Sequence, residues 1–280
     1  MKKLIMVILT LSFSMQLFST PQVGDRLIYK GDTLYVYLLY LPNEFYKYDT
    51  VTIDNSEYIN RIFSVNLFDE KNCWNTACGK GYRAEWAVID DILYLTGIYS
   101  CCYYRDSIKA DLVTLFKEKV INGKVKADWI TEKLFSPQGK RIYYEHWGYG
   151  GINEYELEFY FEKGKLTGTH LYDNTKSRQS IYSQDPEKLY EFIYSNINWK
   201  ILPKQDTVVE VEFIFSANEN GLVDEVEILK GYNEIYDQEA VRVIKLIPEW
   251  DVYFSKGKHT RISLINDIIF SDENRLKYEK

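Results

Sequence analysis

The sequence predicts two domains: an N-terminal, mainly β domain built as an antiparallel sheet or sandwich, and a smaller C-terminal α+β domain in the order helix, strand, strand, helix, strand. Short runs of alternating apolar and polar residues fill the first part, and apolar residues recur at helical spacing from residue 185. The 280 residues, 46% apolar and 27% charged, suffice for two folded domains. We expect the domains at 21–180 and 185–280.

Residues 1–20 predict an export signal peptide. Two lysines precede a mostly apolar run, 4–18, which is shorter than the ~20 apolar residues of a membrane-spanning helix. Cleavage near residue 20 would release a mature chain without a membrane span into the periplasm. The alternative interpretation is that this apolar run stays uncleaved and anchors the protein in the membrane.

Alternation predicts the strands of the first domain, and turn residues predict their ends. These strands lie at 33–41, at 85–99 around a turn at Asp90-Asp91, at 155–161 and at 166–172. Residues 109–120 form either a short helix or a strand, and the alternating residues after the Asn122-Gly123 turn favour the strand.

Four cysteines bear on the compartment and on metal binding: Cys73, Cys78, Cys101 and Cys102. Export would allow them to form disulfides. A hairpin turning at Asp90-Asp91 brings Cys78 beside Cys101 and Cys102, so we predict a bridge from Cys78 to one of that pair, with the three possible pairings left open. The spacing fits no usual zinc site, and we expect no metal or cofactor.

Tyrosine is unusually frequent, with 25 residues. The rings could form a sugar-binding face, but tyrosine also suits half-buried strands, and we favour the second interpretation. The glycine-rich loop with His146, Trp147 and Tyr149 is the candidate ligand site of this domain, unless it simply closes a hairpin.

The second domain follows a polar segment, 173–184, that we interpret as a linker. Asp185 and Pro186 predict a helix start, and Asp237 predicts another for the helix that ends before Pro248. Alternating apolar residues predict a hairpin through the turn at Gly221, which can adopt a positive φ. The predicted strands are 208–215, 222–229 and 261–270.

The segments VEVEFIF, ENG with LVDEVEILKG, YDQEAVRVIKLIPEW and GKHTRISLINDIIF follow one another in this region. In order and spacing they resemble the TonB C-terminal domain family over residues 185–272. The resemblance implies a periplasmic domain that binds an extended segment of an outer-membrane transporter by strand addition to its last strand. The implied partner-binding residues are Arg261, Ser263, Ile265, Asp267 and Ile269. An edge protected by its charges or covered by the first domain is the alternative.

The chain departs from an energy-transducing TonB in two respects. Its six prolines form no long spacer, and Asn198-Trp199-Lys200 replaces the family's usual Tyr-Pro after the first helix. The resemblance therefore supports the fold more strongly than a transducing role.

Other function classes have less support. The net charge of −7 disfavours nucleic-acid binding. No catalytic motif is present, the histidines are scattered, and we expect Glu154, Glu156 and Glu158 to be a solvated strand face, so a non-enzymatic protein is predicted. A secreted carbohydrate- or protein-binding module, including an immunity-type protein, acting through the tyrosine-rich domain is the alternative function.

Overall fold

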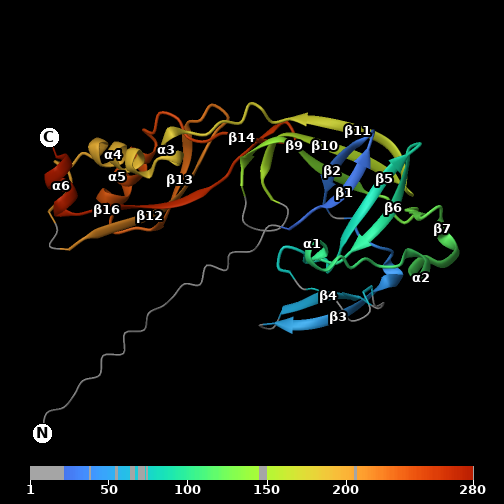
Figure 1. Cartoon of the computed structure of the whole chain (residues 1–280). Helices are drawn as coiled ribbons and strands as arrows, with labels where there is room; N and C mark the ends of the chain where they lie inside the picture. The colour runs from blue at the N-terminus through green and yellow to red at the C-terminus, as the bar shows by residue number, and fades with distance from the viewer. Residues whose placement is uncertain are drawn as a thin grey trace, which may run out of the picture.

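The computed structural model describes residues 22–37, 39–53, 56–63, 67–68, 73, 75–144, 150–204 and 207–279, with the backbone alone at 47–63. The described chain is mainly β, with a large mixed sheet and small helices. The large sheet lies at one end of the molecule, and most of the orange-to-red C-terminal elements lie at the other (Figure 1). Residues 1–20, predicted to be the signal peptide, lie outside the described residues.

The large sheet has the strand order β2-β1-β5-β6-β11-β10-β9, and the short β7-β8 hairpin pairs with β6. Its strands are β1 (Asp25–Tyr29), β2 (Asp32–Val36), β5 (Arg83–Ile89), β6 (Ile92–Tyr99), β7 (Val120–Ile121), β8 (Lys124–Lys126), β9 (Lys133–Tyr143), β10 (Ile152–Glu162) and β11 (Lys165–Asp173). The parallel pairing of β1 with β5 makes the sheet mixed, which corrects the prediction of a wholly antiparallel sheet. A parallel neighbour requires a long crossover, and the segment between β2 and β5 supplies it. That segment includes a separate hairpin of β3 (Tyr46–Ile53) and β4 (Ser56–Phe63).

Two-residue turns close four hairpins of the large sheet, and both residues of each turn have positive φ angles, as type I′ turns require. These turns are Lys30-Gly31, Asp90-Asp91, Asn122-Gly123 and Lys163-Gly164. A Cβ on Gly164 would also lie 2.5 Å from the carbonyl oxygen of Ala127, so the close packing excludes a side chain there. The hairpins predicted around Asp90-Asp91 and between 155 and 172 are confirmed. Residues 109–120 contain α2 (Leu112–Phe116) rather than a long strand.

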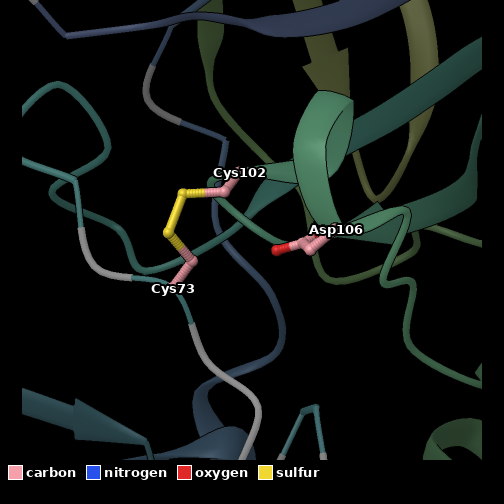
Figure 2. Close-up of side chains that lie close together, drawn as sticks. All are labelled: Cys73, Cys102 and Asp106. Atoms are coloured by element: carbon pink, nitrogen blue, oxygen red, sulfur yellow. A yellow bond between two sulfur atoms is a disulfide. The ribbon is translucent and has the colours of Figure 1, made fainter.

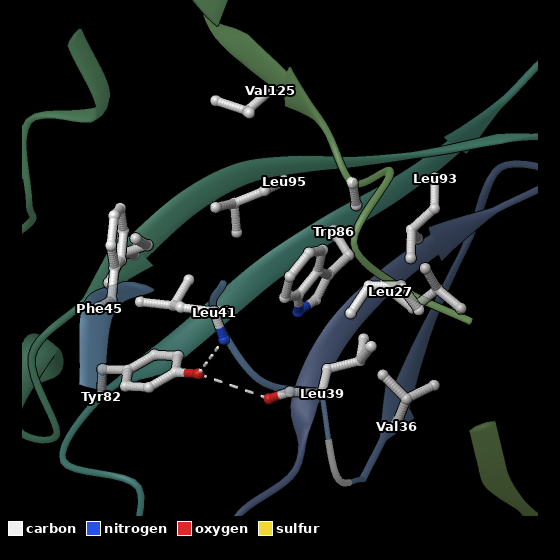
Figure 3. Packing of buried hydrophobic residues seen from close by; sticks show 14 of the residues in the cluster. Leu27, Val36, Leu39, Leu41, Phe45, Tyr82, Trp86, Leu93, Leu95 and Val125 are labelled. Atoms are coloured by element: carbon white, nitrogen blue, oxygen red, sulfur yellow. Dashed lines mark hydrogen bonds between the residues drawn. The ribbon is translucent and has the colours of Figure 1, made fainter. Parts of the chain in front are cut away.

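Aliphatic side chains pack around the fully buried Trp86 in the core of this part (Figure 3). Asp25 lies in the same core, and its carboxylate accepts hydrogen bonds from the Ala84 N–H at 3.0 Å and from Trp86 Nε1 at 3.2 Å. Lys80 Nζ pairs with it at 2.5 Å. Burial lowers the pKa of Lys80, and Asp25 opposes that shift. The buried acid is therefore fully partnered, as a charge removed from water must be.

The C-terminal part contains a three-stranded antiparallel sheet in the order β13-β12-β16. Its elements are α3 (Ile181–Gln184), α4 (Pro186–Asn196), β12 (Val209–Ala217), β13 (Val223–Lys230), α5 (Glu234–Ile244), β14 (Tyr253–Ser255), β15 (Lys258–Thr260), β16 (Leu264–Phe270) and α6 (Asp272–Tyr278). Asp185 caps α4 as predicted, by accepting from the Lys188 N–H at 3.3 Å. Alternate apolar residues of β12 are buried against α4 and α5, and they form a second hydrophobic core.

Three element boundaries differ from the prediction. Strand β2 ends at Val36, whereas the predicted strand continued to residue 41. Asn233, not Asp237, caps α5 through the N–H groups of Ile235 and Tyr236, because the Asp237 carboxylate instead accepts from the Tyr232 N–H at 2.9 Å. The last strand begins at Leu264 rather than at residue 261, since the chain first forms the β14-β15 hairpin.

The predicted linker is structured and tied to the C-terminal part. Arg178 and Val252 exchange two backbone hydrogen bonds of 2.9 Å, and Ser180 Oγ donates to the Glu249 carbonyl at 2.7 Å. Residues 177–184 are therefore packed against the C-terminal part rather than extended freely between the two parts. Among the described helices, none is both long and apolar enough to cross a membrane.

Candidate functional site

The outer edge of β16 is the candidate site. Strand β16 pairs with β12 on one side, and no other described strand pairs with it on the opposite side. The Ile269 N–H donates to Tyr194 Oη at 3.4 Å, so it points away from β12. Because successive strand residues point their backbone groups to opposite sides, Ile265, Asp267 and Ile269 present theirs to the outer edge.

Side chains of this protein partly occupy that edge. The Asp267 N–H donates to Asn266 Oδ1 at 2.8 Å, and the Ile269 carbonyl accepts from Asn274 Nδ2 at 2.9 Å. These are single contacts from side chains, and the contact from the Tyr194 hydroxyl is long for a hydrogen bond. A partner strand could therefore replace them with a regular backbone ladder.

A groove of about 970 Å³ runs along this edge, between α4 and α6. Four α4 residues at positions i, i+3, i+4 and i+7 line it, namely Glu187, Tyr190, Glu191 and Tyr194. The rings of Tyr190 and Tyr194 stack with centroids 6.0 Å apart, and Tyr278 of α6 stacks on Tyr194 at 5.5 Å. The groove thus has an aromatic wall beside a strand edge. We call it the β16 groove.

A second hollow of about 490 Å³ continues past the start of β16, and Tyr190 lines both hollows. Leu264 and Ile265 of β16 and Trp250 contribute to it. Trp250 Nε1 is the buried side-chain polar atom that lacks a hydrogen-bond partner within the described part of the chain. The two hollows together follow the whole length of β16.

Acidic side chains dominate the electrostatics of the β16 groove. Burial, and then Asp267, raise the pKa of Tyr190. The pKa of Lys277 is raised by its hydrogen bond to Tyr278 and, more weakly, by Glu191 and Glu273. The contributions of the acids to these pKa shifts are secondary, but they have the sign that a negative potential produces, because such a potential disfavours tyrosinate and favours ammonium.

The structure separates the five predicted edge residues. Ile265, Asp267 and Ile269 lie on β16, whereas Ser263 and Arg261 precede it. Arg261 is engaged elsewhere, since its guanidinium donates to both carboxylate oxygens of Asp224 at 2.6 and 3.0 Å. The Arg261 hydrogen bond is the main cause that lowers the pKa of Asp224 to about 2. Arg261 therefore joins the lead-in of β16 to β13 and is not available to a partner strand.

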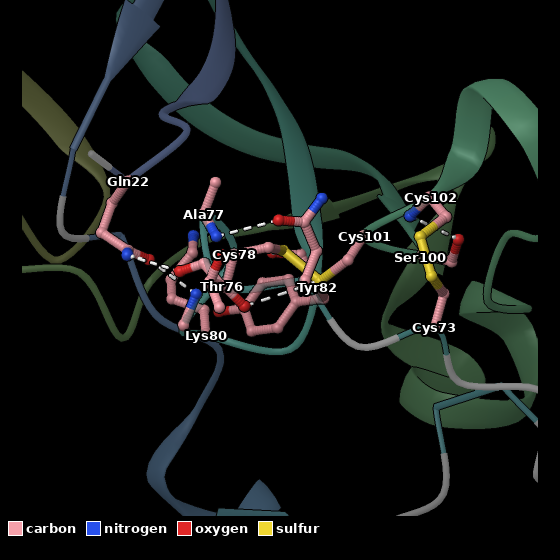
Figure 4. Close-up of a disulfide and its surroundings, with 12 residues drawn as sticks. Gln22, Cys73, Thr76, Ala77, Cys78, Lys80, Tyr82, Ser100, Cys101 and Cys102 are labelled. Carbon is pink, nitrogen blue, oxygen red and sulfur yellow. Dashed lines mark hydrogen bonds between the residues drawn. A yellow bond between two sulfur atoms is a disulfide. The ribbon is translucent and has the colours of Figure 1, made fainter. Parts of the chain in front are cut away.

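The cysteines form two disulfides, Cys78–Cys101 and Cys73–Cys102 (Figure 4). The predicted bridge from Cys78 to one of the adjacent cysteines is confirmed. Asp106 lies close to the Cys73–Cys102 bridge (Figure 2), but its carboxylate accepts from Ser100 Oγ at 2.5 Å and from the Ile108 N–H at 2.9 Å. Sulfurs joined in a disulfide offer no thiolate to a metal ion, so we interpret this group as a structural cross-link.

Glu158 corrects the expectation of a solvated acidic face on β10. The residue is only 2% exposed, and its carboxylate accepts from the hydroxyls of Tyr160 at 2.6 Å and Tyr172 at 2.7 Å. Burial acts to raise the pKa of Glu158, but the two tyrosine hydroxyls and Lys133 outweigh it, and the pKa is lowered. The cross-strand tyrosines thus satisfy a buried charge. His146, Trp147 and Tyr149, the candidate ligand loop, lie outside the described residues.

The contribution of α4 to the groove escaped the sequence prediction. The i, i+3, i+4, i+7 stripe of α4 is visible in the sequence, but its two glutamates are typical of a solvated face, and nothing in the pattern predicts that Tyr194 is buried. Comparison of the chain with protein-family models, with curated proteins and with solved structures finds no match.

Proposed function

We propose that this protein is a non-enzymatic, exported protein of the Gram-negative envelope that binds a protein partner through its C-terminal part. The partner contributes an extended segment that pairs with the outer edge of β16. The observation that carries the proposal is the combination of this edge with the β16 groove. Strand addition needs outward backbone groups for affinity and side-chain pockets for specificity, and the edge and the groove offer both.

Two further features support the proposal. The order α4, β12, β13, α5, β16 agrees with the helix-strand-strand-helix-strand order of the TonB-like domain that the sequence resembles, with the β14-β15 hairpin inserted before the last strand. Two disulfides are typical of proteins that fold in an oxidising compartment such as the periplasm. By the same resemblance, we propose a periplasm-facing segment of an outer-membrane transporter as the partner.

Hydrogen exchange measured by NMR tests strand addition directly. The purified protein is titrated with peptides from the periplasm-facing segments of outer-membrane transporters, each matching the seven residues of β16 in length. We expect the outward amides of Ile265 and Asp267 to gain protection, while the Ile268 amide, which points to β12, is already protected. Absence of binding by every peptide, or protection confined to other elements, would contradict the proposal.

The first domain favours a second candidate function, small-ligand binding. A hollow of about 270 Å³ lies where the β14-β15 turn meets β9 and β10, lined by the rings of Tyr37 and Phe135 and by Arg141, Glu156 and Lys256. Aromatic rings beside polar groups are suited to a sugar. A glycan array probed with the protein and with the Phe135→Ala variant tests this function. We expect a glycan signal that the variant loses, and an array without such a signal would contradict sugar binding in this hollow.

A further inference from the structure

The side chains that line the β16 groove indicate which kind of partner segment could bind there. Four carboxylates line the groove: Glu187 and Glu191 on α4, Asp267 on β16 and Glu273 on α6. Lys277 is the basic residue in its lining. None of the ion pairs found within the described residues uses these four carboxylates.

Some other acidic residues of the same sheet do form ion pairs. On the opposite edge of the same sheet, Asp224 and Glu225 contact Arg261, and Lys230 of β13 pairs with Glu210 of β12 at 2.9 Å. Arg261 and Lys230 therefore balance part of the negative charge of the far edge, whereas the groove places four carboxylates beside Lys277 with no ion pair between them. Complementary charge from a partner would relieve the repulsion within the groove.

The aromatic wall of the groove also favours a positively charged partner. Tyr190, Tyr194 and Tyr278 form a stacked series beside the four carboxylates. Tyrosine faces attract the guanidinium of arginine and the ammonium of lysine, and the long aliphatic stems of these residues cover apolar surface. A carboxylate beside a ring gives the cation both an ion pair and a stacking surface.

We propose that the extended segment bound at β16 is basic, with arginine or lysine at alternate positions. In a strand added to β16, alternate side chains point toward the same face, so every second residue could reach the groove. The proposal rests on strand addition at β16. It specifies the chemistry of the partner: a cationic, extended protein segment.

A bound metal ion does not explain these carboxylates. Within the described residues, one group has three potential ligand atoms close enough together to hold an ion, and it consists of Cys73, Cys102 and Asp106. This group does not belong to the groove. The groove acids are spread along two helices and a strand instead. Such a distribution fits an elongated cationic ligand better than a point charge.

Three peptides with one backbone pattern test the inference. Each has the seven-residue length of β16 and alternates valine with a variable residue, which is arginine, glutamine or glutamate. Fluorescence anisotropy measures their affinities for the protein at low and at high salt. We expect the arginine peptide to bind about tenfold more tightly than the glutamine peptide at low salt, and the glutamate peptide to bind most weakly. The arginine advantage shrinks at high salt because the groove charges are exposed.

Two variants with the same number of altered charges locate the effect. Glu187→Gln with Glu191→Gln should reduce the arginine advantage about three- to tenfold and leave the affinity of the glutamine peptide unchanged. The control, Glu219→Gln with Glu227→Gln at exposed positions on β13 and in the turn before it, should leave both affinities unchanged. The unchanged glutamine-peptide affinity also shows that the α4 variant is folded.

The outcomes separate this inference from the proposed function. If the glutamine peptide binds β16 as tightly as the arginine peptide, strand addition stands and the basic partner is wrong. If no peptide binds, strand addition itself fails. A second copy of this chain could also occupy the β16 edge, and sedimentation of the protein alone tests whether it dimerises. If it does, and if hydrogen exchange shows that the dimer protects the amides of Ile265 and Asp267, the inference is overturned.

Discussion

At the scale of single residues, the Arg261–Asp224 contact shows how one ion pair positions the candidate strand. Arg261 lies just before β16, and Asp224 lies at the start of β13, on the far side of β12. Both hydrogen bonds go to the carboxylate form of Asp224, so the ionised acid is favoured in the folded protein. The contact therefore ties the entrance of β16 to the opposite edge of the sheet.

The pKa of Asp224 gives the first prediction. Arg261→Gln should raise it from about 2 toward its ordinary value of 3.8, because the guanidinium is the main cause of the shift. A lowered folded-state pKa means that the contact contributes stability above about pH 4 and loses it as the pH falls toward 2. NMR titration of the Asp224 carboxyl measures the shift. An unchanged pKa in Arg261→Gln would assign it to Asn218, the second side-chain partner.

Tyr194 is the residue that links α4 to the candidate strand, and it gives the second prediction. Tyr194→Phe removes the hydroxyl that accepts from the Ile269 N–H and keeps the ring that stacks on Tyr190 and Tyr278. We expect the Ile269 amide to exchange faster and the melting temperature to fall only slightly, since the hydrogen bond is long. Tyr190→Phe, whose hydroxyl contacts Asn266 instead, is the matched control. Equal exchange of the Ile269 amide in all three proteins would show that the hydroxyl does not occupy the edge.

At the scale of elements, the two disulfides hold the segment before β5 against the turn that follows β6. The bridges Cys78–Cys101 and Cys73–Cys102 are nested, with sequence separations of 23 and 29 residues. Closing a loop of that size stabilises a folded chain by about 3 kcal/mol in the chain-entropy model. The outer bridge closes only a short additional loop once the inner bridge exists.

The third prediction follows from the nested arrangement. Cys73→Ser with Cys102→Ser should lower the free energy of unfolding by about 2–3 kcal/mol, and removing both bridges should cost more than either alone. Denaturant unfolding of the oxidised variants measures these differences. The pair Cys78→Ser with Cys101→Ser is the comparison. Unfolding free energies equal to that of the unaltered protein would mean that neither bridge constrains the unfolded chain.

The sequence predicted those elements that depend on residues close to one another in the chain. The turn at Asp90-Asp91, the cap at Asp185 and the buried alternation of β12 depend on neighbours within a few residues, and each is confirmed. The parallel pairing of β1 with β5 and the burial of Glu158 depend on contacts distant in sequence, so alternation could not reveal them. In the candidate site, the resemblance indicated β16 itself, while the α4 wall became visible only once the helix was placed beside the strand.

At the scale of the whole molecule, the described chain has two hydrophobic cores joined by a junction of hydrogen bonds and ring contacts. The β14-β15 hairpin belongs to the second part by sequence, yet it packs on β10 of the first (Figure 1). Lys256 at its turn lies 3.8 Å from the centre of the Phe135 ring. The rings of Tyr143 and Tyr253 also meet there, with centroids 5.0 Å apart, and hydrogen bonds add to these contacts between the two parts.

Asn174 is the centre of that junction. It is fully buried, its Oδ1 accepts from the Gly257 N–H at 2.9 Å, and its Nδ2 donates to the Asn153 carbonyl at 3.0 Å and to Glu156 Oε1 at 3.2 Å. One side chain thus bonds both β10 and the β14-β15 turn. Removing it takes this partner from three polar groups that are partly buried or exposed, and each lost hydrogen bond costs roughly 0.5–1.5 kcal/mol.

The fourth prediction is that Asn174→Ala uncouples the two parts. We expect the C-terminal part to unfold in a separate transition and residues 173–184 to become accessible to protease, because the segment loses its anchor on β10 while each core stays intact. Calorimetry and limited proteolysis measure the two effects. Thr175→Ala, which removes only an exposed hydroxyl bonded to Asp173, is the control. A single transition at the midpoint of the unaltered protein would place the coupling in the Arg178–Val252 backbone bridge instead.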